Sequence, residues 1–224
     1  SDGTEAQLPF YLSEHTVWNS AHKGVSDRLG YFQKEVMVAA TGLGPLIETH
    51  GTPFYCKVDI EGMDLQAINS LHPDALPPYF SCESECYGYD EVFTEEQSLA
   101  TLLALYEKGY RSFKLVEQEG LEEITDRRKR YGKPSLPQRL LRKLSLVPSA
   151  VEEIQQKRTV YNQRHGYEFP PGASGTGPLV PSFREGNWLD FSTAQDLLRY
   201  YRRQKLAFDG QNLWFDLHAR LFRN

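Results

Sequence analysis

The sequence has little cysteine, no long hydrophobic run and no excess of positive charge. Three cysteines in 224 residues do not form the even framework that stabilises small secreted domains, which predicts reduced thiols and a cytoplasmic protein. No run of about 18 apolar residues occurs, so no transmembrane helix and no membrane partner are expected. A formal charge of -5 argues against nucleic acid as a general partner.

Several catalytic motifs are also missing. The chain has no G-x-S-x-G elbow, no G-x-x-x-x-G-K-[ST] loop and no H-E-x-x-H pair, which argues against the hydrolases and nucleotide-binding proteins that carry them. The glycines of 172–177 follow no clear strand, so we interpret that stretch as a loop. Cys82 and Cys86 have no second cysteine pair, and no metal site is expected.

What the first half does contain is an alternation of short strand and helix patterns. Helix 94–108 is the best marked, because Thr94 and Gln97 form a capping box and Gly109 provides the stop. The order strand, helix, strand, helix, strand at such short spacings predicts an α/β fold with a parallel βαβαβ sheet. Strands are predicted at 8–13, 34–39, 54–60, about 78–85 and 110–116, and further helices at 43–51 and from 64.

The amino-acid composition changes after Glu119. The stretch from Arg127 to Lys143 holds eight Lys or Arg residues and no acid, and it predicts an exposed basic insertion. A helix from Ser192 and an apolar tail that docks on the domain follow. We therefore divide the chain into a core (1–120), a basic helical insertion (121–165) and a C-terminal extension that packs on the core (166–224).

Acidic residues follow two of the predicted strands. Asp59 and Glu61 come at the end of the strand 54–60, and Glu83 and Glu85 at the end of the next. Ligands of open α/β sheets bind beyond the carboxyl ends of the strands, so these acids are candidates for a site. The alternatives are a helix cap and solvated charges.

Two neighbours of these acids are also of interest. Gly62 permits a positive φ and the close approach of a ligand to the backbone. Lys57 shares a strand face with Asp59, either as an ion-pair partner or as part of the site.

Three stretches carry a resemblance to a known family. "HGTPFYCKVDIEGMDLQAINSL", "PPYFSCESE" and "LYEKGYRSFKLVEQ" resemble the core of the FkbM-type methyltransferases, which depend on S-adenosylmethionine and are recognised by a K-[IV]-D-[IV]-E-G strand end. Downstream, residues 166–221 are similar to the C-terminal section of longer members. The resemblance implies a partial Rossmann-like methyltransferase sheet, with helices on both faces and an α-helical C-terminal extension.

The resemblance also implies a reaction and a set of site residues. The cofactor would be S-adenosyl-L-methionine, and the acceptor a hydroxyl of a small molecule or glycan. The candidate catalytic residues are Asp59 first and Glu61 second. Such a carboxylate would either accept the proton of the acceptor hydroxyl or hold the acceptor in line for attack on the methyl group. Asp59 and Gly62 would contact the cofactor. The acceptor would be bound by Lys57, Glu83 and Glu85. Whether the protein assembles into a homo-oligomer stays open.

The sequence departs from the family at its start. The family binds its cofactor chiefly through a glycine-rich turn after the first strand and an acid after the second, and the chain contains neither. We expect it to be a fragment or a truncated product without the first βαβ half, about 70 to 90 residues, and to bind the cofactor weakly or not at all.

Two other functions stay open. One is a non-catalytic binding module that holds an anionic partner through Arg127–Lys143, with an affinity that falls steeply with salt. The other is a metal-dependent hydrolase that uses Asp59, Glu83 and Glu85. A methyltransferase fits the sequence best.

Overall fold

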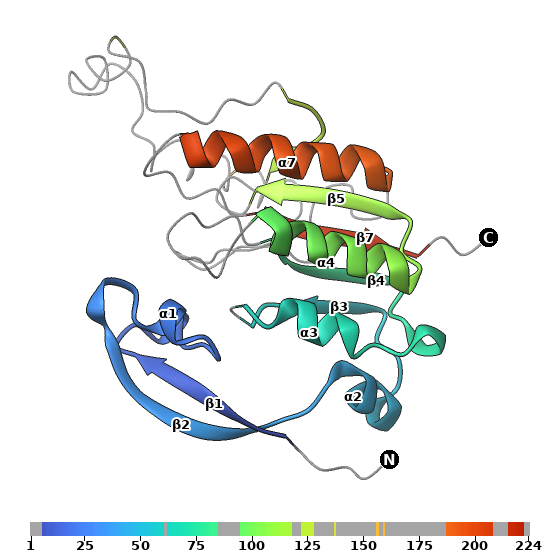
Figure 1. The fold of residues 1–224 in the computed structure, drawn as a ribbon. Helices are drawn as coiled ribbons and strands as arrows, with labels where there is room; N and C mark the ends of the chain where they lie inside the picture. The colour runs from blue at the N-terminus through green and yellow to red at the C-terminus, as the bar shows by residue number, and fades with distance from the viewer. Residues whose placement is uncertain are drawn as a thin grey trace.

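The structure is a computed structural model that describes residues 6–60, 62–84, 95–117, 122–127, 137, 156, 159, 187–207 and 215–221. The strands form two sheets: a five-stranded sheet with helices packed against it, and a long two-stranded hairpin beside it (Figure 1). The chain is therefore of mixed α/β class, as the sequence predicts.

The five-stranded sheet is mixed and has the order β3-β4-β7-β5-β6. Strands β3 and β4 are parallel, whereas β7 runs antiparallel to both of its neighbours, β4 and β5. Strand β6 pairs antiparallel with β5 at one edge. The strands span Tyr55–Val58 (β3), Tyr79–Ser84 (β4), Ser112–Glu117 (β5), Glu122–Ile124 (β6) and Phe215–Arg220 (β7).

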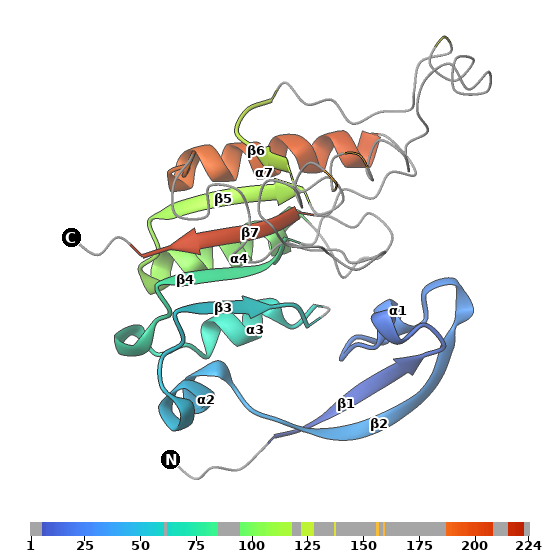
Figure 2. The same cartoon turned by 180° about the vertical axis from the view of Figure 1, so that it is seen from behind.

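Two features of this order differ from our expectation. We expected a parallel sheet, but β7 and β6 pair antiparallel with their neighbours, and β3 lies at the edge of the described sheet. We also expected the segment after residue 166 to pack on the core, but its strand β7 lies inside the sheet, between β4 and β5 (Figure 2). Strands β4 and β5 run in the same direction without being hydrogen-bonded neighbours.

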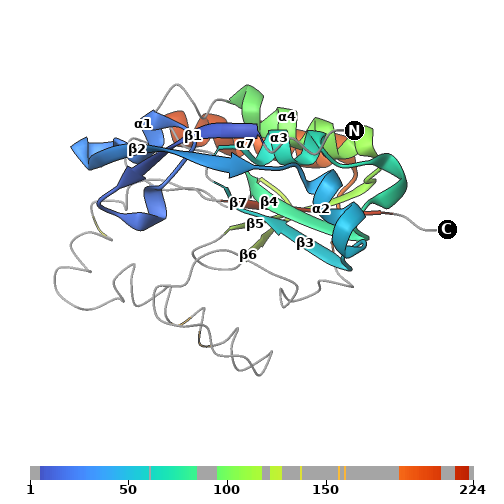
Figure 3. The same ribbon diagram turned by 90° about the horizontal axis from the view of Figure 1, so that it is seen from below.

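Helices cover one face of the sheet. Among the described helices, Figure 3 places α3 (Asp64–Asn69), α4 (Glu95–Lys108) and α7 (Phe191–Ala207) together on the same side of the strands. The described residues do not test the expected helices on the second face. Helix α4 ends at Gly109, which has a φ of 120° and closes the helix as predicted. Helix α7 begins after Asp190, whose Oδ1 accepts the N–H of Thr193 at 2.7 Å.

The α-helices are α1 Lys23–Ser26, α2 Leu43–His50, α3 Asp64–Asn69, α4 Glu95–Lys108 and α7 Phe191–Ala207. Three 3-10 turns span Thr16–Trp18, Arg28–Gly30 and Pro73–Ala75.

The hairpin consists of β1 (Ala6–Ser13) and β2 (Phe32–Ala40), which pair antiparallel. A groove of about 360 Å³ separates one of its faces from Ile60 and from helix α3. Its lining is mainly apolar and includes Leu8, Phe10, Val38 and Met63.

The main core lies between the sheet and its helices. Phe80, Phe113, Leu115 and Leu217 come from the strands, and each is at most 1% exposed. They pack in one cluster with residues of α4 and α7 such as Leu102 and Leu198. Of the basic insertion (121–165), the structure describes only residues 122–127, 137, 156 and 159.

Candidate functional site

The second face of the sheet carries a row of polar side chains that is nevertheless largely buried. The register of the strands places Lys57 beside Ser81, Ser81 beside His218, and His218 beside Lys114. Residues that are partners across a sheet point to the same face. Ser81, His218 and Lys114 are at most 3% exposed, so these polar groups are shielded from water.

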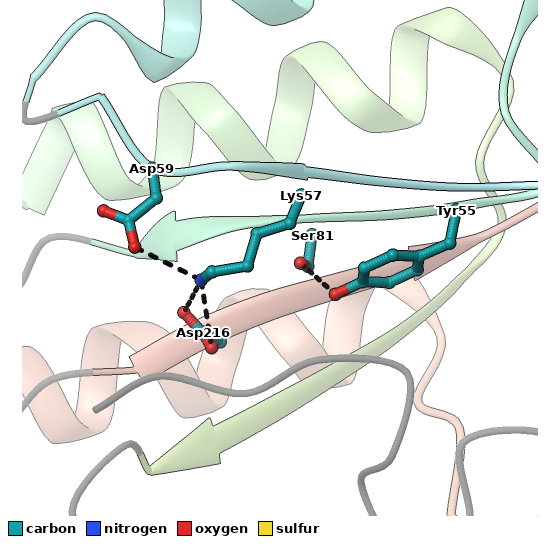
Figure 4. A network of polar contacts seen from close by, with 5 residues as sticks. All are labelled: Tyr55, Lys57, Asp59, Ser81 and Asp216. Atoms are coloured by element: carbon teal, nitrogen blue, oxygen red, sulfur yellow. Dashed lines mark hydrogen bonds and ion pairs between the residues drawn. The ribbon is translucent and has the colours of Figure 1, made fainter. Parts of the chain in front are cut away.

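Lys57 joins two carboxylates at the end of this row (Figure 4). Its Nζ lies 3.4 Å from Oδ2 of Asp59 and 3.3 Å from Oδ1 of Asp216. The Asp59 side chain is 46% exposed and that of Asp216 is 0% exposed. Lys57 therefore links a buried acid of β7 to the acid that faces solvent after β3.

The charges of this cluster stabilise one another. Burial lowers the pKa of Lys57, but the carboxylates of Asp216 and Asp59 outweigh burial and raise this pKa to about 12. Lys57 is therefore a cation throughout the physiological range. A fixed cation beside Asp59 keeps that carboxylate oriented.

A tyrosine lies beside the cluster on the same face. Tyr55 Oη and Ser81 Oγ are 2.6 Å apart and form a hydrogen bond in which either hydroxyl is the donor. Burial raises the pKa of Tyr55 to about 12. The phenol is therefore neutral at pH 7 and can act as a hydrogen-bond donor or acceptor.

The centre of the polar face holds a neutral histidine between two lysines. Burial lowers the pKa of His218 to about 3, and the charges of Lys57 and Lys114 act in the same direction. Lys114 donates to Oε1 of Glu123 at 2.9 Å. Trp188 covers the far end of this face, where its ring lies 4.8 Å from Nζ of Lys114.

The turn after β3 is the other part of the site. Gly62 has a φ of 99°, a conformation that L-residues rarely adopt. Its carbonyl oxygen lies 3.2 Å from Nε2 of His22. The turn leads directly into α3, whose first residue, Asp64, is only 4% exposed.

The structure brings together some of the predicted site residues. Asp59 and Lys57 are in contact, and Lys57 does make the ion pair considered from the sequence. Glu83 lies near the end of β4, is the register partner of Asp216 and is 6% exposed. Gly62 occupies the turn, whereas Glu61 and Glu85 lie outside the described residues.

Sequence reasoning missed Asp216 and His218. Both lie in a segment that alternates between apolar and polar residues, Phe215 to Arg220, which is the period of a strand with two different faces. We interpreted this segment as an apolar tail because its aromatic content is high. The alternation is the signal that could have identified it as a strand with a polar face.

No group of three or more metal-ligating side chains occurs among the described residues. Glu85, which the sequence offered together with Asp59 and Glu83, lies outside them. Within the same residues, no helix combines the length and the apolar character needed to span a membrane. Comparisons with protein-family models, curated proteins and solved structures gave no match to this chain.

Proposed function

We propose that this chain is the part of an S-adenosylmethionine-dependent O-methyltransferase of the FkbM type that binds the methyl acceptor. The acceptor is a hydroxyl group of a small molecule or glycan. The observation that carries the proposal is the position of Asp59, directly after a strand that runs parallel to its neighbour and beside the fixed cation Lys57. Polar groups at such a strand end are where α/β sheets bind their ligands.

The apolar groove beside the hairpin supports the same proposal. The groove of about 360 Å³ borders the same turn and is large enough for a small molecule.

The fit to the cofactor is partial. Asp59 and Gly62 are the residues that would lie against S-adenosylmethionine, because an exposed carboxylate and a glycine with positive φ allow close approach. When bound, the cofactor would supply the methyl group. The glycine pair that follows β2, Gly42 and Gly44, packs against Ser70 and His72, so the described residues offer a partial cofactor site.

The residues of the chain itself would position the acceptor. Asp59 accepts a hydrogen bond from the acceptor hydroxyl, and Lys57 holds Asp59 in place through its contacts with both carboxylates. Asp216 is a positioning residue, because it acts on the acceptor only through Lys57. The exclusion of water from the buried polar face strengthens each of these interactions.

A methyl-transfer assay on the complete product of the coding sequence tests the proposal. Transfer of labelled methyl groups from S-adenosylmethionine to a panel of small alcohols and sugars is expected. Asp59→Asn should lower kcat about 100-fold and change cofactor affinity little. Asp74→Asn, which alters an exposed acid of a 3-10 turn, is the matched control.

Two results would count against the methyltransferase. One is that calorimetry detects no cofactor binding by the complete product. The other is that Asp59→Asn keeps full activity. Salt-sensitive retention of the protein on heparin without methyl transfer would instead favour the binding module that acts through Arg127–Lys143.

A further inference from the structure

The groove beside the hairpin has two walls of apolar side chains. One wall is the hairpin face that carries Leu8, Phe10 and Val38, and the other is built from Ile60, Met63 and α3. The space between the walls measures about 360 Å³, which lies in the size range of small-molecule sites. Ile60 is 46% exposed, although apolar side chains gain free energy when they leave water. An apolar ligand between the walls would provide that gain.

The two walls are joined at both ends of the groove. At one end, Nε2 of His22 lies 3.2 Å from the carbonyl oxygen of Gly62. At the other end, the backbone N–H of Leu43 donates to Oγ of Ser70 at 2.8 Å. A Cβ added at Gly42 would lie only 2.7 Å from Cβ of Ser70, so the hairpin approaches α3 as closely as glycine allows. The groove is therefore a preformed feature of the fold.

These contacts give the groove a direction. The end near His22 is the end of Ile60, and Ile60 directly follows Asp59 in the chain. Consecutive Cα atoms are about 3.8 Å apart, so this end adjoins the strand end that carries the candidate site. Strand β3 also points its carboxyl end toward α1 and this part of the hairpin (Figure 2). The opposite end lies where Thr41 and Gln66 line the groove.

The charges indicate which ligand fits. Among the described residues, no side chain that lines the groove is charged, and the polar ones are Thr41 and Gln66. A sugar body, with a hydroxyl on nearly every carbon, would lose hydration there and regain few hydrogen bonds. The adjoining strand end holds the two carboxylates of Asp59 and Asp216 with the single cation Lys57. An anionic head group would be repelled by this excess of acid.

We propose that this groove binds the apolar body of the acceptor, with the hydroxyl group at the Ile60 end, beside Asp59. The acceptor is therefore a neutral alcohol with a hydrocarbon body, and not a sugar. The hairpin selects the substrate, because Leu8, Phe10 and Val38 form one wall of the groove. The inference rests on the proposed function for the reaction at the hydroxyl, but not for binding in the groove.

NMR of the complete product of the coding sequence with 1-octanol provides the test. The hairpin wall from Ala6 to Phe10 is about 14 Å long at ~3.4 Å per residue, which accommodates an extended octyl chain. We expect saturable shifts of the methyl resonances of Val38 and Ile60. Intermolecular NOEs should join the carbon that bears the hydroxyl to Ile60, and the terminal methyl to Ala40. Glucose should shift none of these resonances, and octanoate should bind about tenfold more weakly than octanol.

Two adjacent alanines of β2 provide matched variants. Ala40 lines the groove, whereas Ala39 is exposed on the opposite face of the hairpin. Ala40→Phe should fill part of the groove and weaken octanol binding about tenfold or more. Ala39→Phe adds the same side chain outside the groove and should leave the affinity for octanol unchanged.

Several results would overturn the inference. The first is that octanol causes no saturable shift of the groove resonances in the unaltered protein, a result that requires no variant to fold. Binding of glucose or octanoate as tight as that of octanol would exclude the proposed ligand class. A terminal methyl at Ile60 would exclude the proposed orientation. Equal affinities of Ala40→Phe and Ala39→Phe would show that octanol binds elsewhere.

These binding measurements use neither the cofactor nor the methyl-transfer reaction. Octanol binding in the groove of a protein that transfers no methyl group would overturn the proposed function alone. Methyl transfer to sugars by a protein that does not bind octanol in the groove would overturn this inference alone.

Discussion

The two faces of the five-stranded sheet are built by the same strands and differ in almost every respect. On the helix-covered face, one register row runs through Cys56, Phe80, Ala219 and Phe113. The adjacent row on the opposite face runs through Lys57, Ser81, His218 and Lys114. Both rows are mostly shielded from water, so burial alone does not explain which residues they contain.

The difference separates the residues that stabilise the fold from those that make a site. Apolar side chains gain free energy when they leave water, whereas buried charges lose hydration that ion pairs recover only in part. A well-packed apolar face would therefore stabilise the sheet as well or better. The buried charges around Asp216 are expected to serve function rather than stability.

The largest effect is expected on the helix-covered face. Phe113 is 0% exposed and belongs to the main core cluster, so Phe113→Ala should lower the free energy of unfolding by about 3–5 kcal/mol. Denaturant unfolding followed by circular dichroism measures the change. Phe54→Ala, at a side chain that is 57% exposed, should cost less than about 1 kcal/mol. Similar costs for both variants would contradict the assignment of this face as the core.

A second effect should come from Asp64 and should depend on pH. Its folded-state pKa of about 6 lies above the ordinary 3.8, so the folded protein binds more protons than the unfolded chain between these values. Stability should therefore fall by up to about 3 kcal/mol as the pH rises from 4 to beyond 6.

Asp64→Asn should remove this part of the pH dependence, which unfolding measurements at several pH values can detect. The stability of the variant should be closest to that of the unaltered protein near pH 4, and it should be higher than that of the unaltered protein above pH 7. Parallel stability curves for the two proteins would show that Asp64 does not titrate in this way.

On the polar face, the ion pair of Lys57 and Asp216 should have a smaller effect. Asp216→Asn leaves Lys57 with Asp59 alone, and because Lys57 is 28% exposed we expect a loss of only about 2 kcal/mol. The double variant Lys57→Met with Asp216→Leu should recover most of this loss, since apolar replacements of buried ion pairs are often neutral. If the double variant lost as much free energy of unfolding as the two single changes added together, the ion pair would have a structural role.

The smallest effect is expected at Tyr55. Tyr55→Phe removes the hydrogen bond of 2.6 Å to Ser81, which should cost about 1 kcal/mol in thermal or denaturant unfolding. The packing of the ring is kept, so the apolar face should be unaffected. A loss as large as that of Phe113→Ala would remove the contrast between the two faces.

The local elements of the fold follow from the sequence, but their arrangement does not. Helix α4 was predicted from a capping box and a terminal glycine, because these signals act within a few residues of one another. The position of β7 depends on its pairing with β4 and β5, which lie far from it in the chain. No local pattern encodes those partners.

The candidate site divides in the same way. Asp59 and Gly62 could be found because a strand, an acid and a glycine follow one another directly. Asp216 could not be placed, since its importance arises from the register of a strand that was not recognised. Asp64 could be seen in the sequence, but its burial is a property of the folded chain.

The central position of β7 also affects how the protein can form during synthesis. A ribosome that has completed β3 through β6 still lacks the strand that joins them, because residues 215–220 leave it last. At usual elongation rates, on the order of ten seconds separates the emergence of β4 from that of β7. During that interval β4 and β5 each expose an unpaired edge, so the nascent chain should depend on molecular chaperones more than a sheet assembled in chain order.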